Sequence, residues 1–201
     1  MEFPSKTIEK AVEQFKSLPG IGNKTALRLV LSYLKKDPAT QVAFEEAVNG
    51  LRERIVFCSK CHNLSDEKIC GICSSPRRNA SLVCVVQDVR DVLAIESTAQ
   101  FDGLYHILGS VISPMDGVGP SDLNIDSLME RIEADGVNEV IFALSATMEG
   151  DTTIFYLAKK LKEKGVKMST ISRGVAVGGE LEYVDEVTLG RSIAFRVPYQ
   201  E

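Results

Sequence analysis

The first quarter of the chain carries apolar residues at helical spacing. Over Thr7–Ser17 they recur every three or four residues, which places them on one face of a predicted helix. A second apolar stripe follows Asn23, which we expect to cap that helix, and Asp37-Pro38 is expected to end it. A third helical stretch is predicted over roughly Thr40–Ile55. The pattern therefore predicts a helical N-terminal module.

From residue 81 onward, short runs of β-forming residues alternate with helical patterns. The predicted strands are Leu82–Val86, Leu104–Leu108, Glu139–Leu144 and Lys167–Ile171. The predicted helices are Asp88–Ser97, Ile125–Ala134 and Asp151–Lys164. Because such alternation is typical of βαβ units, we expect a mainly parallel sheet. The last stretch, Gly174–Glu201, contains several glycines and shows no clear period.

These patterns predict a multi-module α/β chain. We expect a helical hairpin module at 1–56, a small four-cysteine module at 57–76, an α/β domain with a mainly parallel sheet at 80–173, and a C-terminal extension at 174–201. The length of 201 residues suits one ordinary domain or two to three small modules.

Composition excludes several classes of protein. Hydrophobic residues make up 44% and charged residues 25% of the chain, near globular averages, which argues against disorder, collagen and a coiled coil. The longest apolar run, Leu82–Val86, is far shorter than the roughly 20 residues of a membrane helix. The opening residues lack the basic and apolar regions of an export signal. We therefore expect a cytoplasmic protein without a membrane partner.

Charge is distributed unevenly along the chain. Residues 1–80 contain 13 Lys and Arg against 9 Asp and Glu, whereas residues 81–201 contain 10 against 19. A basic N-terminal part joined to an acidic C-terminal part indicates that only one end contacts a polyanion.

Four of the five cysteines form two Cys-x-x-Cys pairs separated by eight residues: Cys58, Cys61, Cys70 and Cys73. This spacing lets four thiolates converge tetrahedrally on Zn²⁺, and a site filled by four cysteines is structural because no position stays open for catalysis. The alternative is a set of buried or redox-active thiols. His62 is interpreted as an exposed loop residue and not as a ligand. Cys84, inside a predicted strand, is interpreted as a small core residue.

A glycine-rich turn, Leu18-Pro19-Gly20-Ile21-Gly22, separates the first two predicted helices. Backbone N–H groups at the start of the second helix suit a phosphate, and Lys24 and Arg28 are four residues apart and so share a helix face. The pattern resembles the helix-hairpin-helix motif of proteins that bind DNA without sequence preference. The alternative is a plain helical hairpin whose basic residues are only solvated.

The α/β part resembles the Toprim domain of topoisomerases, primases and related nucleases. That resemblance implies a glutamate after the first strand and an acidic pair after a later strand, which together handle Mg²⁺. Here the first position is Gln87, and the pair is Glu149 and Asp151. Gln87 cannot act as a general acid or base. The two carboxylates either bind Mg²⁺ weakly or, as we favour, only cap the following helix near its positive end.

The order of hairpin, four-cysteine site, Toprim-like domain and the segment Gly174–Asp185 resembles the bacterial RecR recombination-mediator family over essentially the whole chain. The stretch Asp116–Pro120 contributes to the resemblance. Two positions depart from the family pattern: Gln87 replaces the usual acid, and Ala176 stands where a proline is common.

The resemblance implies a non-enzymatic DNA-repair factor that carries one structural zinc ion. Such proteins assemble through their N- and C-terminal regions into dimers or ring-like tetramers around DNA. They act with RecO and RecF to load RecA onto single-stranded DNA, in the cytoplasm and at the nucleoid. Glu149 and Asp151, with Glu180 and Glu182 as weaker candidates, are the acidic residues that could contact a basic partner such as RecO.

Two other functions stay open at this point. The first is a Mg²⁺-dependent Toprim nuclease or topoisomerase-like enzyme, which would need a carboxylate at Gln87. The second is a zinc-module scaffold that binds only proteins. ATP hydrolysis is not indicated, because residues 174–190 lack the Gly-Lys-Ser/Thr of a P-loop.

Overall fold

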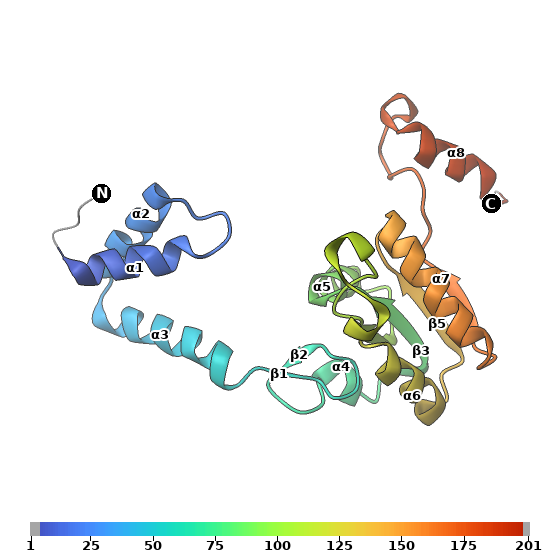
Figure 1. Cartoon of the computed structure of the whole chain (residues 1–201), viewed down its shortest axis with the longest axis horizontal. Coiled ribbons are helices and arrows are strands. Elements are labelled where there is room, and N and C mark those ends of the chain that lie inside the picture. The colour runs from blue at the N-terminus through green and yellow to red at the C-terminus, as the bar shows by residue number, and fades with distance from the viewer. Residues whose placement is uncertain (1–4, 199–201) are drawn as a thin grey trace. The chain divides into compact units, whose positions relative to one another are not determined.

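The computed structural model describes residues 5–198, which divide after Ile55 into two compact units (Figure 1). The helices are α1 Lys6–Lys16, α2 Asn23–Leu34, α3 Pro38–Glu53, α4 Gly71–Ser74, α5 Val89–Ser97, α6 Ile125–Asp135, α7 Met148–Lys162 and α8 Glu186–Ala194. The strands are β1 Val56–Phe57, β2 Leu64–Ser65, β3 Asn79–Val86, β4 Gly103–Ile107, β5 Glu139–Ala143 and β6 Lys167–Thr170. No helix within residues 5–198 combines the length and the apolar character needed to span a membrane.

The N-terminal unit is built on the hairpin of α1 and α2. Its small core consists of Val12, Ala26 and Val30, which lie on the predicted apolar faces of the two helices. The expectation that Asn23 caps α2 is wrong, because Asn23 is the first helical residue and the capping position is Gly22. Gly22 has extended dihedrals and no side chain that could bond to the helix, so the first N–H groups of α2 receive no side-chain cap.

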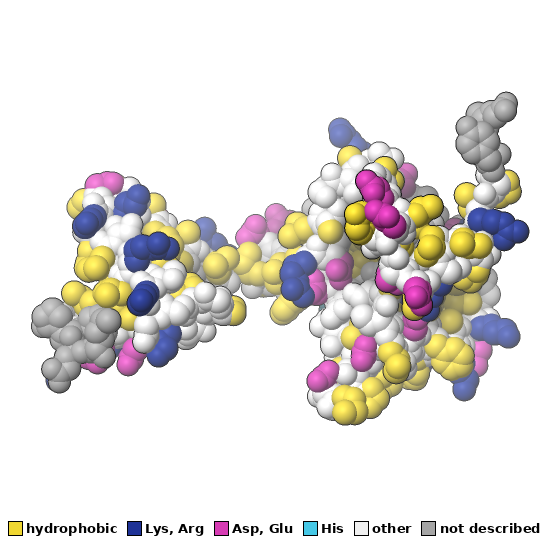
Figure 2. All heavy atoms as spheres, turned by 90° about the horizontal axis from the view of Figure 1, so that it is seen from above, with side chains coloured by type: hydrophobic (Ala, Val, Ile, Leu, Met, Phe, Trp, Pro, Cys, Tyr) yellow, Lys and Arg dark blue, Asp and Glu magenta, His cyan; other side chains and the backbone are white. Residues whose placement is uncertain are grey.

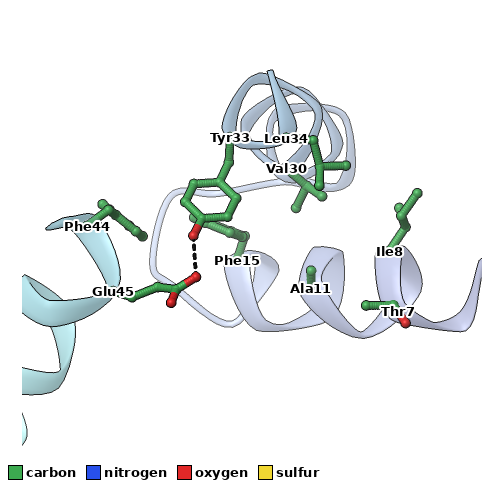
Figure 3. A pocket seen from close by; sticks show the side chains of 9 residues that line it. All are labelled: Thr7, Ile8, Ala11, Phe15, Val30, Tyr33, Leu34, Phe44 and Glu45. Carbon is green, nitrogen blue, oxygen red and sulfur yellow. Dashed lines mark hydrogen bonds between the residues drawn. The ribbon is translucent and has the colours of Figure 1, made fainter. Parts of the chain in front are cut away.

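Helix α3 is held to α2 mainly by Tyr33. The Tyr33 hydroxyl donates to the Glu45 carboxylate at 2.5 Å, and the Gln41 side chain donates to the Tyr33 carbonyl oxygen at 3.0 Å. The Tyr33 and Phe44 rings lie 5.6 Å apart. A mainly apolar pocket of about 240 Å³ lies beside these contacts and is lined by residues of α1, α2 and α3. Phe15 of α1 points into it (Figure 3). No residue of α3 is buried.

The C-terminal unit contains a four-stranded parallel sheet in the order β4-β3-β5-β6. All four predicted strands and the parallel arrangement are confirmed. Side chains of β3 alternate between two cores, as expected for a strand that is covered on both faces. Val83 and Val85 pack with α6 and α7, whereas Cys84 and Val86 pack with α5. Burial also raises the pKa of the Cys84 thiol to about 12, so Cys84 is a core residue and not a reactive thiol.

Two parts of the C-terminal unit differ from the expectation. Helix α7 begins at Met148 and not at Asp151, because the Thr147 side chain caps it by accepting from the Gly150 N–H. The last stretch, in which no clear period predicted an element, contains the 3-10 turn Leu181–Tyr183 and helix α8. Asp185 begins α8 by accepting from the Thr188 N–H at 2.9 Å.

Candidate metal centre and nucleic-acid interface

The four cysteines of the predicted zinc site come from two tight turns. The first turn joins β1 to β2, and the second turn leads into the short helix α4. Within the first turn, the Cys58 N–H donates to the Asn63 carbonyl oxygen at 2.7 Å, and the His62 N–H donates to the Cys58 carbonyl oxygen at 2.9 Å. The Cys70 N–H donates to the Cys58 sulfur at 3.3 Å, which ties the second turn to the first.

The sulfur geometry fits a zinc ion. The four sulfur atoms lie within 4.8 Å of one another, and the Cys61 and Cys70 sulfurs are 3.6 Å apart. A tetrahedral ion with Zn–S bonds of about 2.3 Å requires sulfurs about 3.8 Å apart. Three of the four cysteines are buried and Cys73 is half-buried. All four predicted ligands therefore converge on one point, with no ligand position left for a substrate.

The electrostatics of the cluster favour a bound cation. A hydrogen bond from Cys61 lowers the pKa of the Cys73 thiol to about 6, and the same bond raises the pKa of Cys61 far above its usual value. The Cys73 thiolate therefore forms readily, whereas the raised pKa values of Cys61 and Cys70 show that these two thiols resist ionisation beside it. A divalent cation at the centre removes that penalty, because thiolates are its ligands.

The zinc module is packed against the edge strand of the sheet. The Ile107 N–H of β4 donates to the Cys61 carbonyl oxygen at 2.9 Å, and Ile72 contacts both cores of the sheet. His62 is half-buried, with a left-handed φ of 62°, and its Nε2 lies 2.8 Å from the Ser127 hydroxyl. The interpretation of His62 as an exposed loop residue is therefore wrong. Its ring packs edge-on against the buried His106, and it is no member of the metal-binding group.

The predicted DNA-binding residues lie on one exposed face of α2. Lys24 and Arg28 are both exposed and, together with Lys35, line a surface hollow of about 400 Å³. The turn before them depends on Gly20, whose φ of +80° favours glycine. Figure 2 shows several Lys and Arg side chains on the visible face of the N-terminal unit. Helix α2 begins without a side-chain cap, so its first N–H groups stay open to an anion.

The carboxyl edge of the sheet does not assemble the acidic pair of the Toprim resemblance into one site. Because α7 begins at Met148, Glu149 and Asp151 both lie in its first turn, two residues apart, and so point to different sides of the helix. Glu149 is half-buried and Asp151 is exposed. Gln87 follows β3, and its backbone N–H donates to the Asp91 carboxylate at 3.1 Å.

Asp151 is engaged by two arginines that the sequence analysis did not identify. Arg173 lies 2.7 Å and Arg191 3.9 Å from its carboxylate oxygens, and the Arg173 hydrogen bond is the main cause of the lowered pKa of Asp151. Both arginines follow the last strand, so the Asp151 carboxylate holds the C-terminal segment to α7. Pairing with two arginines favours this structural role of Asp151 over metal binding. Glu180 and Glu182, the weaker candidates, are exposed.

Four family models match successive segments of the chain between residues 8 and 197. A family model described as RecR, helix-hairpin-helix matches residues 8–50, and the model of the RecR zinc finger domain with four cysteines matches residues 55–75. A Toprim domain matches residues 81–172, and RecR, C-terminal matches residues 174–197. The zinc-finger match and the sulfur geometry together support a structural zinc ion at the four cysteines.

Curated relatives are similar over their full length. The chain is 58% identical to Recombination protein RecR of Bacteroides thetaiotaomicron over 97% of its own length and 95% of that protein. It is 58% identical to Recombination protein RecR of Flavobacterium psychrophilum, over 100% and 97% of the two chains. The chain is 53% identical to the protein of the same name from Amoebophilus asiaticus, over 99% of its own length and 100% of that protein. The chain therefore belongs to the RecR recombination protein family.

Proposed function

We propose that this chain is a DNA-binding recombination mediator in recombinational DNA repair. Relatives that match it from end to end are named recombination proteins, which supports a role in recombination. The observation that carries DNA binding is the pair of exposed cations on α2, which follows a hairpin of the helix-hairpin-helix type. On this proposal the protein works in the bacterial cytoplasm, at the nucleoid during repair, and helps RecO and RecF load RecA onto single-stranded DNA.

The proposed division of labour follows the modules: 1–56 contacts DNA, 57–76 holds zinc, 80–173 forms the Toprim-like core, and 174–201 takes part in assembly. Charge supports this division, because the basic part of the chain contains the hairpin and the acidic part contains the sheet. Glu149 and Asp151, with Glu180 and Glu182, belong to the acidic surface proposed to receive RecO. Because Asp151 is paired with Arg173, the carboxylates left to a partner are Glu149 and the exposed Glu180 and Glu182.

Exposed apolar side chains support assembly into a homo-oligomer. Helix α3 exposes Val42, Phe44, Val48 and Leu51, and the C-terminal segment exposes Leu181, Tyr183, Val187 and Phe195. Clusters of this kind mark surfaces that another protein covers. We propose that a second copy of the chain covers them, giving a dimer or a tetrameric ring whose mass light scattering can measure with and without DNA.

The test of DNA binding reverses the two charges on α2. The double variant Lys24→Glu with Arg28→Glu should weaken binding to every DNA sequence alike, because phosphate contacts carry affinity but no base information. The slope of log Kd against log salt should fall by about one unit for each lost phosphate contact. Fluorescence anisotropy titrations at several salt concentrations measure both quantities.

The matched control makes the same charge change elsewhere. Lys159→Glu with Lys162→Glu alters two exposed lysines of α7 and should leave both affinity and salt slope unchanged. A hairpin variant that binds as tightly as the wild type would exclude the α2 face as the DNA-binding surface. Loss of binding in the control as well would indicate a response to net charge alone.

We also propose that the protein performs no phosphoryl transfer. That chemistry needs a positioned metal ion and a group that manages a proton, and Gln87 supplies no ionisable group. Wild-type protein with Mg²⁺ or Mn²⁺ should therefore leave DNA uncleaved and unrelaxed. The variant Gln87→Glu tests whether one added carboxylate is enough to create a metal site.

The variant Glu149→Ala tests the proposed partner surface. It should lose RecO binding while it retains zinc and DNA binding.

Asp151 needs a separate variant in this experiment. Asp151→Ala also frees Arg173 and Arg191, so it tests attachment of the C-terminal segment as well as partner binding. The enzyme alternative would be favoured by metal-dependent cleavage in the wild type that disappears in Glu149→Ala with Asp151→Ala. A gel assay with supercoiled plasmid and single-stranded DNA detects either activity.

A further inference from the structure

Arg131 is a buried arginine of α6 that reaches the backbone of the zinc module. Its side chain is 5% exposed. Its Nη1 donates to the Tyr105 carbonyl oxygen at 2.6 Å and lies 3.5 Å from the carbonyl oxygen of Lys60. Since Lys60 lies between Cys58 and Cys61, the guanidinium reaches the backbone that carries two of the four cysteines.

Protein groups compensate the charge of Arg131 only in part. Its Nε lies 3.4 Å from Asp135, but the Asp135 carboxylate lies at the same distance from the Lys60 ammonium. The buried Nη2 has no hydrogen-bond partner among residues 5–198. The neighbouring rings of His62 and His106 carry no negative charge in either protonation state. A buried cation in such surroundings requires a further negative partner, because desolvating an unpaired charge is costly.

The zinc site supplies negative charge of the required size when it is occupied. Four thiolates around one Zn²⁺ ion bear two net negative charges. We propose that Arg131 is the counter-charge of the zinc centre, a positioning residue that stabilises the four thiolates from a helix outside the zinc module.

The proposal makes the stabilisation mutual. Arg131 strengthens zinc binding, and the occupied site in turn stabilises the buried guanidinium by the same free energy. Because Arg131 also bonds to Tyr105 of β4, zinc occupancy is coupled to the attachment of α6 to the edge of the sheet. The alternative is that Arg131 only satisfies backbone carbonyl oxygens at that edge.

Two substitutions separate charge from hydrogen bonding. Arg131→Met keeps the length and apolar stem of the side chain but removes its charge, and it should weaken zinc binding by about ten- to a hundredfold. Arg131→Lys keeps the charge but loses the planar donor group, and it should retain most of the affinity. Zinc affinity of the full-length chain is measured by competition with a chromophoric chelator, and the Co²⁺ spectrum checks that four thiolates still bind.

Two controls keep the test decisive if Arg131→Met folds poorly. Arg78→Met removes another arginine that donates to backbone carbonyl oxygens at β4, but Arg78 is paired with Glu96. It should lower thermal stability and leave zinc affinity unchanged. Asp135→Asn removes the carboxylate that competes for Arg131 and should tighten zinc binding.

Either of two results with the Arg131 variants would overturn the proposal. The first is an unchanged zinc affinity in Arg131→Met, and the second is an equal loss of zinc affinity in Arg131→Met and Arg131→Lys. Weaker zinc binding in Asp135→Asn would also overturn it, because a purely structural Arg131 loses an anchor in that variant. Tighter zinc binding in Asp135→Asn, weaker binding in Arg131→Met and nearly wild-type binding in Arg131→Lys would together establish the counter-charge.

Discussion

Gly150 shows how a single residue sets the position of a helix end. A Cβ atom on Gly150 would lie 2.1 Å from the Ser145 carbonyl oxygen, a backbone atom that cannot move aside without shifting the loop after β5. The absence of a side chain therefore lets the first turn of α7 approach this loop. The close approach also fixes where Glu149 and Asp151 emerge from the helix.

Gly150→Ala should destabilise the protein by about 1–3 kcal/mol, the usual cost of overpacking. Denaturant unfolding measures this loss as a lower midpoint with an unchanged slope. Gly190→Ala is the matched control, because a Cβ atom there meets no heavy atom within 4 Å and Gly190 lies inside α8. Alanine should be neutral or slightly stabilising at that position. Equal stability of the two variants would show that the loop after β5 adapts freely.

At the scale of elements, one carboxylate joins α5 to two strands. Glu96 of α5 accepts from the Arg78 guanidinium, which precedes β3, and from the Tyr105 hydroxyl of β4 at 2.7 Å. Arg78 also donates to the Phe101 and Gly103 carbonyl oxygens at 3.1 and 3.4 Å. The hydrogen bond from Arg78 is the main reason why the pKa of Glu96 is lowered.

Glu96→Gln should cost about 1.5–3 kcal/mol at neutral pH, the range for hydrogen bonds to charged groups. The folded-state pKa of Glu96 lies below its unfolded value, so this stabilisation is fully present above pH 4.5 and is lost as the pH falls below that value. The difference between wild type and variant should therefore shrink on acidification, as urea titrations at several pH values can measure. A difference that stays constant at low pH would assign the effect to packing instead of charge.

Regular elements could be predicted from the sequence where burial leaves a clear apolar pattern along the chain. The helices α1 and α2 were predictable because burial of one face imposes a helical period on the sequence, and the four strands because each is a short run of β-forming, mainly apolar residues. The start of α7 was missed because the Thr147 cap precedes a turn without apolar period. Helix α8 was missed for a related reason: its apolar residues stay exposed, and only the Asp185 cap indicates where it begins.

Only the four cysteines of the zinc site could be predicted from the sequence, and not the residues that contact them from other elements. The four cysteines lie in two short motifs, so their spacing alone indicated the zinc site. Arg131 was not predicted, because its contact with Lys60 joins segments 71 residues apart, and no local pattern records such a contact. Its one signal is a charged residue next to the buried Ile132 in an amphipathic helix. The pairing of Asp151 with Arg173 likewise depends on how the chain returns after β6.

At the scale of the whole molecule, zinc should hold the second unit together without affecting the first. The metal site joins β1, β2 and α4 to the edge of the sheet through the bond from Ile107 to Cys61. The hairpin of α1 and α2 has its own core in the other compact unit. Loss of metal therefore removes folding free energy from residues after Ile55 only.

Elemental analysis should find one zinc ion per chain. Removal of that ion by a strong chelator should unfold the four-cysteine module, and the substitution Cys58→Ser should have the same effect. Hydrogen exchange resolves how far the effect spreads. The Ile107 amide should lose protection first, because its acceptor is the Cys61 carbonyl oxygen, whereas the Leu108 amide bonds to Val86 inside the sheet and should stay protected longer. Amides of α1 and α2 should exchange as in the zinc-bound protein. A metal-free chain in which the Ile107 amide keeps its protection would contradict a structural role for zinc.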